Sequence, residues 1–370
     1  MKIRSALLAF AVAGVLGSTE SLAQNAYITN NQSNNVSVIN TRTNEVITTI
    51  PVGGGWGVAV SPDGRKVYVA NGELAVIDTA TNTVATTLGI CGPNSIGVAV
   101  SPDNSKVYVT CTGGSVLVIN TATYAVTATI PVSGVPYGVA VTPDGKKVYV
   151  TDYNDSTVTV INPMTNTVIA TMQVGPPFTF PAAGAVAVSP DGSKVYVTNQ
   201  TSDTVAVINT ATDTVTATIP VGDSISVAVS PDGSKLYIPN RGNHTAIVDA
   251  ATNQVITSTD FIGGGQFGVS VTPDGRKVYV ANYAADTVTV IDSMTYAILG
   301  TVPVGSDPLA FGIFIQPAPK FAGIPGKSNC HGQSVSALAR QYGGLNNAAA
   351  SLGYPSVSAL QNAVEAYCET

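Results

Sequence analysis

The chain has 370 residues, of which 45% are hydrophobic and only 10% are charged, and its formal net charge is −6. This composition excludes a disordered chain, and an acidic balance without a basic cluster argues against binding to a nucleic-acid backbone. Abundant Val, Thr and Ile favour many buried strands, and all-β folds often reach this length as one domain.

Residues 1–23 have the pattern of a secretory signal peptide. Lys2 and Arg4 precede an apolar run from Ala6 to Gly17, and small residues follow up to Ala23. The run is too short for a membrane-spanning helix, and no later segment is predicted to span a membrane. We predict a secreted, periplasmic or cell-envelope protein; a retained N-terminal anchor is the alternative. Removal of two basic residues and one acidic residue changes the formal charge from −6 to −7.

A repeat of about forty residues governs the chain after this segment. Its most regular phrase is Ser/Thr-Pro-Asp followed three residues later by Lys, and the prolines lie 40, 41, 47, 41 and 42 residues apart. Each repeat is predicted to form four strands, as in "GVAVSP" (a), "KVYVAN" (b), "VTVIN" (c) and "TATIPV" (d). This period is typical of one four-stranded propeller blade. The strands are apolar on both faces, as sheets covered on both sides require.

The two ends of the repeat region complement each other. Six full cycles run from Gly57 to about Ala310, residues 27–52 supply only strands b, c and d, and "FGIFIQP" from Phe311 supplies a lone strand a. Joining the fragments predicts a seventh blade that closes a ring over residues 24–318. An open superhelical stack is the alternative, and the complementary ends argue against it.

The phrases "KVYVTN" at Lys194, "VAVSPDG" at Val186 and "TATIPVG" at Thr216 resemble the YVTN family of β-propeller repeat proteins. The resemblance covers about residues 26–318. It implies a seven-bladed β-propeller that is often exported or at the cell surface. It implies no shared reaction, because propellers serve as binding platforms, scaffolds and enzymes.

Strand alternation divides the turns between two faces. The a–b and c–d turns form one face, here named the repeat-turn face, and the d–a and b–c loops form the other, the variable face. The Asp residues of the a–b turns are interpreted as turn formers and not as catalytic groups. Loops on a rigid scaffold commonly carry binding residues, so we expect function on the variable face.

Aromatic residues repeat in the d–a loops of the variable face. Four stand just before strand a, and the longest loop, "GPPFTFPAAG", adds two more. One interpretation is an apolar-rimmed site for a small molecule or peptide. The other is a plug that packs the inner strands. The candidates are Trp56, Tyr137, Phe178, Phe180, Phe267 and Phe311.

Polar candidates lie on the same face. Asp152 opens the loop "DYND", which suggests either part of a hard-cation site or an ordinary Asx turn; no complete calcium spacing is present. Arg241 forms a basic pair with His244 in "NRGNH", and a solvated hairpin tip is the alternative to a binding role. Asp223 and Asp307 are candidates for paired carboxylates near the axis. No motif for haem attachment, nucleophilic serine or phosphate binding occurs, so we predict no catalytic residue, metal or cofactor.

Four cysteines permit two disulfides in an exported protein. Cys111 ends strand b in "KVYVTC", where other repeats have Asn or Asp, and Cys91 lies in the d–a loop that leads into the same blade. We predict that Cys91 and Cys111 form a disulfide on the variable face, stabilising by about 3 kcal/mol.

The composition changes after residue 318. A linker (319–328) precedes Ala- and Leu-rich segments with helical spacing over residues 329–370, bracketed by Cys330 and Cys368. We predict a small helical module held by a Cys330–Cys368 disulfide, with Ser334 and Ser356 as N-caps. A metal ligated through Cys330 and the next residue, a His, is the weaker alternative.

These features predict an exported monomer that binds an unknown small molecule, peptide or envelope protein on its variable face. A propeller enzyme, either a hydrolase, a lyase or a cofactor-dependent oxidoreductase, is the second hypothesis. A passive cell-surface scaffold is the third. A channel closed by aromatic rings would favour binding, and converging carboxylates would favour an enzyme.

Overall fold

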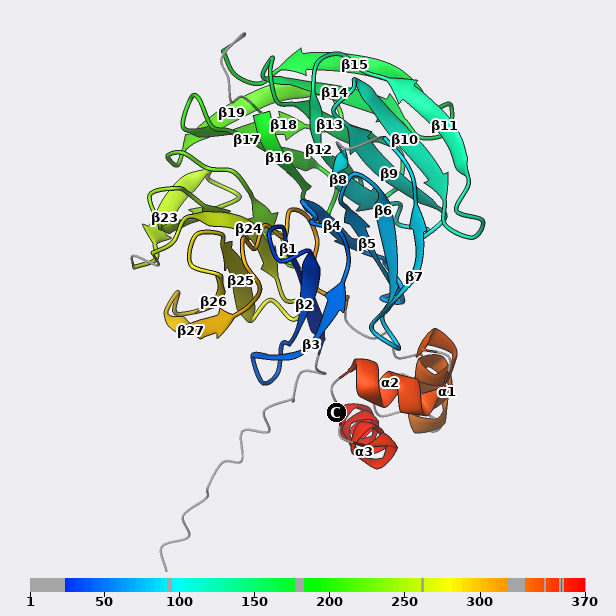
Figure 1. Cartoon of the computed structure of the whole chain (residues 1–370). Helices are drawn as coiled ribbons and strands as arrows, with labels where there is room; N and C mark the ends of the chain where they lie inside the picture. The colour runs from blue at the N-terminus through cyan, green and yellow to red at the C-terminus, as the bar shows by residue number, and fades with distance from the viewer. Residues whose placement is uncertain are drawn as a thin grey trace, which may run out of the picture.

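A computed structural model describes residues 24–91, 95–176, 183–260, 263–317 and 330–369, the last range without residues 343, 353 and 355. The predicted signal peptide and linker lie outside these residues. Seven sheets surround a central axis, and a group of short helices lies beside them (Figure 1). The predicted seven-bladed β-propeller is therefore confirmed.

Each sheet joins strands that are consecutive in the chain. Blade 1 has three such strands, and residues near the C-terminal end of the propeller pair with β1 in place of its strand a. Blades 1 and 2 contain β1 (Asn25–Asn30), β2 (Asn35–Asn40), β3 (Glu45–Pro51), then β4 (Gly57–Val60), β5 (Lys66–Ala70), β6 (Leu74–Asp78), β7 (Thr83–Leu88). Blades 3 and 4 contain β8 (Ser95–Val100), β9 (Lys106–Cys111), β10 (Ser115–Asn120), β11 (Val126–Pro131), then β12 (Pro136–Val141), β13 (Val148–Asp152), β14 (Thr157–Asn162), β15 (Thr167–Gln173). Blades 5 and 6 contain β16 (Ala183–Val188), β17 (Lys194–Asn199), β18 (Thr204–Asn209), β19 (Thr214–Pro220), then β20 (Ala228–Val229), β21 (Lys235–Pro239), β22 (Thr245–Asp249), β23 (Gln254–Ser258). Blade 7 contains β24 (Gln266–Val271), β25 (Lys277–Asn282), β26 (Thr287–Asp292) and β27 (Ile298–Pro303).

The tyrosine of the repeated strand b connects several blades to the next one on the repeat-turn face. All seven of these tyrosines are buried. The Tyr149 hydroxyl of blade 4 donates to Asp213 Oδ1 in the c–d turn of blade 5 at 2.6 Å. The Tyr279 hydroxyl of blade 7 donates to Asn44 Oδ1 of blade 1 at 2.6 Å, so this link also crosses the closure of the ring.

The threonine two residues later makes a second link, near the axis. Thr110 Oγ1 accepts a hydrogen bond from Gly97 N within its own blade and donates to Tyr137 O of the next blade, both at 2.7 Å. Thr151 and Thr198 repeat this arrangement in blades 4 and 5. The repeated phrase therefore encodes contacts between blades, which explains its regularity without a catalytic role.

The C-terminal end of the propeller closes the ring twice. In residues 308–316, Phe314 O accepts a hydrogen bond from Tyr27 N of blade 1 at 2.8 Å. On the other side, Phe311 O accepts from Val58 N of blade 2 at 2.9 Å. The segment thus supplies the missing strand of blade 1, as predicted, and also binds the inner strand of blade 2. Phe314 is fully buried and packs with residues of both ends of the chain.

Three helices follow the propeller: α1 (Cys330–Tyr342), α2 (Leu345–Ser351) and α3 (Val357–Glu369). They enclose a core of their own, and the predicted Cys330–Cys368 disulfide joins α1 to α3. Ser356 caps α3, because its Oγ accepts from Ala359 N at 3.1 Å. The prediction for Ser334 is wrong, since α1 already begins at Cys330 and Ser334 lies inside it, buried. None of these described helices is long and apolar enough to cross a membrane.

Candidate functional site

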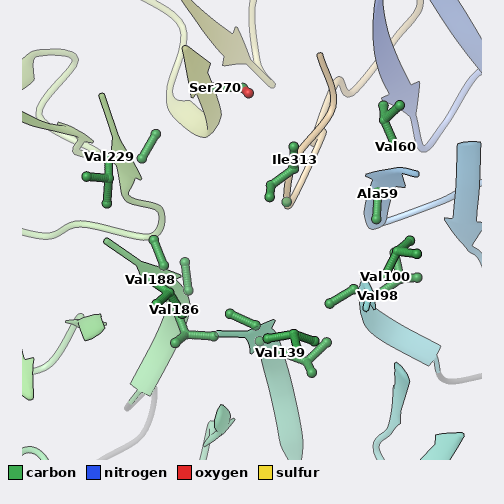
Figure 2. Close-up of a pocket in the computed structure, with 18 of the residues that line it drawn as sticks. Ala59, Val60, Val98, Val100, Val139, Val186, Val188, Val229, Ser270 and Ile313 are labelled. Atoms are coloured by element: carbon green, nitrogen blue, oxygen red, sulfur yellow. The ribbon is translucent and has the colours of Figure 1, made fainter. Parts of the chain in front are cut away.

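A channel of about 470 Å³ runs along the propeller axis between the inner strands. Figure 2 shows its wall of aliphatic side chains, among them Val100, Val139, Val188, Val229 and Ile313. Strand a supplies these residues in every blade, because its small and β-branched residues leave space at the centre of the ring. Among the described residues, the wall contains no ionisable side chain.

Aromatic rings close the channel at the variable face. Phe311 lines the end of the channel, and Tyr137 and Phe267 pack against it edge-on at centroid distances of 5.0 and 6.2 Å. All three rings are buried. The structure therefore brings these three predicted residues together as the plug that the second interpretation describes.

Trp56 lies on the outer side of this plug. Its ring is 5.9 Å from that of Phe267 and 6.4 Å from that of Tyr137, both in edge-to-face arrangements. The side chain nevertheless remains 36% exposed. Edge-to-face contacts with two buried rings hold the indole in a defined orientation. Trp56 is therefore a fixed aromatic surface, open to solvent, in the middle of the variable face.

Two aromatic residues of this cluster were not among the predicted site residues. Tyr153 stacks on Tyr137 at 4.7 Å, and Tyr283 meets Phe267 edge-on at 6.5 Å. Both directly follow the last residue of a strand b, and they are the aromatic residues of the b–c loops. This shared position in the b–c loops could have identified both tyrosines, but the prediction considered aromatic residues of the d–a loops only. Phe178 and Phe180 lie outside the described residues.

Burial raises the pKa of two tyrosines in the cluster. Desolvation raises the pKa of Tyr137 far above its ordinary value, and it raises the pKa of Tyr153 as well. A phenol is neutral at physiological pH even at its ordinary pKa, and these shifts move both groups further from ionisation. They offer ring surface and hydroxyl groups, and not phenolate nucleophiles.

Asp152 is a capping residue in the structure. It is only 3% exposed, and its Oδ1 accepts backbone hydrogen bonds from Val135 N at 3.2 Å and Asn154 N at 2.9 Å. This geometry is an ordinary Asx turn, which was the alternative to a hard-cation site at Asp152. No group of three or more metal-ligating side chains occurs in the part of the chain that the structure describes.

The other polar candidates lie partly exposed on the variable face. Arg241 Nη1 is 3.7 Å from Asp223 Oδ2, and the two side chains are 45% and 40% exposed. Asp307 Oδ2 accepts from Asn31 Nδ2 at 3.0 Å. Each group already has a partner on the surface.

Charge is distributed unequally between the two faces. The described variable-face loops contain eight acidic residues and one basic residue, a formal charge of −7. The repeat-turn face, with the strand ends beside it, contains eleven acidic and ten basic residues, a formal charge of −1. The acidic residues of the variable face are Glu73, Asp152, Asp155, Asp203, Asp223, Asp260, Asp286 and Asp307, and the basic residue is Arg241.

The predicted Cys91–Cys111 disulfide is present, with its Cα atoms 5.3 Å apart. In other blades a glycine of the d–a loop lies directly over the Asn or Asp that ends strand b; a Cβ on Gly175 would overlap the amide of Asn199. Gly134 has the same relation to Asp152. Blade 3 thus replaces a packed Gly–Asn pair with a covalent bond at the equivalent position.

Comparisons with known proteins support the fold. No family model matches the chain, and no curated protein matches it in sequence. Among solved structures, the chain is similar to hydrazine synthase of Kuenenia stuttgartiensis, with a TM-score of 0.61 and 19% identity over 69% of this chain and 88% of that one. At this identity the likeness shows a β-propeller and nothing about activity.

Proposed function

We propose that this β-propeller is an exported binding protein of the YVTN type that recognises a cationic partner on its variable face. The observation that carries the proposal is Trp56, a rigidly packed and solvent-exposed ring at the centre of acidic loops. The proposed partner is a Lys- or Arg-rich peptide segment of another exported or envelope protein.

The chemistry of the face fits such a partner. An ammonium or guanidinium group is attracted to the face of an indole ring, and the ring of Trp56 is partly exposed to solvent. Surrounding carboxylates raise the local concentration of cations and speed their association. The nearly neutral opposite face offers no comparable attraction, so the partner would approach from one side.

Three features support export. The first 23 residues have the pattern of a signal peptide, the phrases of strands a, b and d resemble the YVTN family, and the described residues contain two disulfides. Disulfides persist in oxidising compartments.

Binding is favoured over catalysis by the state of the channel. Aromatic rings close it at the variable face, and its described wall has no carboxylate. Asp223 and Asp307, the carboxylates considered for acid–base catalysis, are each engaged by a neighbouring side chain.

Trp56 also supplies the test, because it is the single tryptophan of the chain. Its fluorescence should change and saturate when a lysine-rich peptide is added, and should not change with a glutamate-rich peptide of equal length. Added salt should weaken the response, since it screens exposed charges. No saturable change with the lysine-rich peptide would contradict the proposal.

Charge variants sharpen this experiment. Glu73→Gln, Asp203→Asn and Asp260→Asn together remove three carboxylates of the variable face, and they should weaken binding by about 1 kcal/mol, roughly fivefold. For a matched pair that removes one carboxylate each, Glu73→Gln alone should weaken binding, and Glu45→Gln on the repeat-turn face should leave the affinity unchanged. Equal effects of both changes would show that overall charge, and not this face, attracts the peptide.

A further inference from the structure

The channel has the properties of a second binding site, separate from the variable face. Its volume of about 470 Å³ lies within the range of small-molecule pockets. The plug of Tyr137, Phe267 and Phe311 stands between this space and Trp56. A ligand in the channel would therefore not occupy the surface proposed for the cationic partner.

The apolar wall of the channel is open to solvent. Ile313 is 68% exposed, although the next residue, Phe314, is fully buried between the blades. Figure 2 shows Ile313 at the lumen, with Val100 and Val188 elsewhere on the wall. Water against such a wall is released when an apolar molecule replaces it, which favours binding.

The chemistry of the wall selects against charged ligands. An ion that entered would lose its hydration and meet no opposite charge among the described lining residues. Ser270 supplies a hydroxyl where blades 2 and 4 have Ala59 and Ala140 in the same place of strand a, and Figure 2 shows its oxygen at the wall. Ser61 and Ser226 also line the channel, and a few hydroxyls among aliphatic groups suit an uncharged ligand with few polar atoms.

The entrance lies at the repeat-turn face. Prolines of the a–b turns line this end of the channel, including Pro62, Pro143 and Pro190. The adjacent carboxylates are held by their own turns: Asp63 Oδ1 accepts from Ser61 Oγ at 2.6 Å. The opening therefore presents proline rings, while the variable-face end is closed by the plug.

We propose that the propeller binds an uncharged, predominantly apolar small molecule in this channel, which enters between the a–b turns and ends against Phe311. The inference goes beyond the proposed function, since it concerns a different ligand and the opposite face. Volume, accessible apolar wall, absence of ionisable lining groups among the described residues, and the closed end all support this one class of ligand.

The test uses an uncharged phenylnaphthylamine dye and the full-length protein. The dye should bind saturably with one site per chain, and its fluorescence should rise in the apolar surroundings. Val100→Phe with Val188→Phe fills the lumen and should weaken dye binding by about tenfold or more. The matched control is Val126→Phe with Val215→Phe, on the outer strands of the same two blades, where both side chains are exposed. It should bind within about twofold of the unchanged protein.

Either of two dye results would overturn the proposal: no saturable dye binding by the unchanged protein, or equal dye binding by the lumen and outer-strand variants. If the lumen variant does not fold, crystals of the unchanged protein under xenon pressure provide the second measurement. Xenon between Val100, Val188 and Ile313 is expected, since accessible apolar cavities bind it. A lumen without xenon would contradict the proposal. Loss of peptide binding at Trp56 with dye binding intact would reject only the variable-face function.

Discussion

On the repeat-turn face, polar side chains of one blade bind the turns of the next: Tyr149 bonds to Asp213 and Lys147 to the same carboxylate. On the variable face, the loops differ from blade to blade and leave acidic groups and the ring of Trp56 in solvent. Both faces are built by the same seven repeats. Their difference shows that the repeated residues maintain the ring, whereas residues outside the repeat pattern are available for recognition.

The largest expected effect is on the disulfide of blade 3. There, a cysteine outside the repeat pattern occupies the last position of a repeated strand b. Cys91→Ser with Cys111→Ser should lower the free energy of unfolding by about 3 kcal/mol, because the bond closes a loop of 20 residues. Denaturation by urea under non-reducing conditions measures this loss. A loss below about 1 kcal/mol would show that the bond stabilises little.

A second pair of substitutions separates the bond from the packing that it replaces. Cys91→Gly with Cys111→Asn restores the Gly–Asn pair of other blades, and Cys91 already has a φ of +54° that glycine adopts without strain. This variant should be more stable than the serine pair. If the two variants are equally stable, the Gly–Asn pair does not substitute for the disulfide.

A smaller effect is expected for a single link of the repeat-turn face. Tyr149→Phe removes a hydrogen bond to the Asp213 carboxylate and should cost about 2 kcal/mol. Tyr108→Phe is the control at the same position of strand b, because the Tyr108 hydroxyl is buried with no hydrogen-bond partner in the described structure. Removal of the Tyr108 hydroxyl should leave the free energy of unfolding unchanged or raise it slightly. Equal destabilisation by both changes would show that the hydroxyl link contributes nothing specific.

The smallest effect is the acid response of the a–b turns. Hydrogen bonds from Ser189 Oγ and Ser193 N lower the pKa of Asp191 from 3.8 to about 2, and those from Ser230 and Ser234 do the same for Asp232. A pKa that is lower in the folded state stabilises above the unfolded value and is lost as the proton binds. Stability should therefore fall between pH 4 and about 2.

Urea midpoints measured across this pH range test the acid response. Asp191→Asn with Asp232→Asn should lower the midpoint at neutral pH and reduce its decline below pH 4. A decline of unchanged size in the double variant would assign the acid response to other carboxylates.

Much of the fold could be predicted from the sequence because the repeat specifies it locally. Pro-Asp turns fix the a–b reversals, the period of about forty residues fixes the blade, and the fragments at the two ends fix the closure. The Cys91–Cys111 disulfide was predictable for the same reason, since each cysteine stands at a definite position of the repeat. Ser334 was assigned as a cap wrongly, because outside the repeats only local propensity was available.

The candidate site was less predictable. Sequence placed Trp56, Tyr137, Phe267 and Phe311 at one end of the channel, but which rings are buried depends on how seven separate loops meet at the axis. Tyr153 was missed because its stacking partner, Tyr137, lies in β12 and is distant in the sequence. The imbalance of charge between the faces likewise appears only after each loop is assigned to a face.

The most direct test of the division between the two faces measures affinity and stability together in two variants. Trp56→Leu retains apolar packing and removes the indole ring, so it should abolish calorimetrically measured binding of the lysine-rich peptide and change the unfolding free energy by less than about 1 kcal/mol. Tyr149→Phe should do the reverse, with lower stability and unchanged affinity. Loss of binding in Tyr149→Phe, or intact binding in Trp56→Leu, would contradict the account.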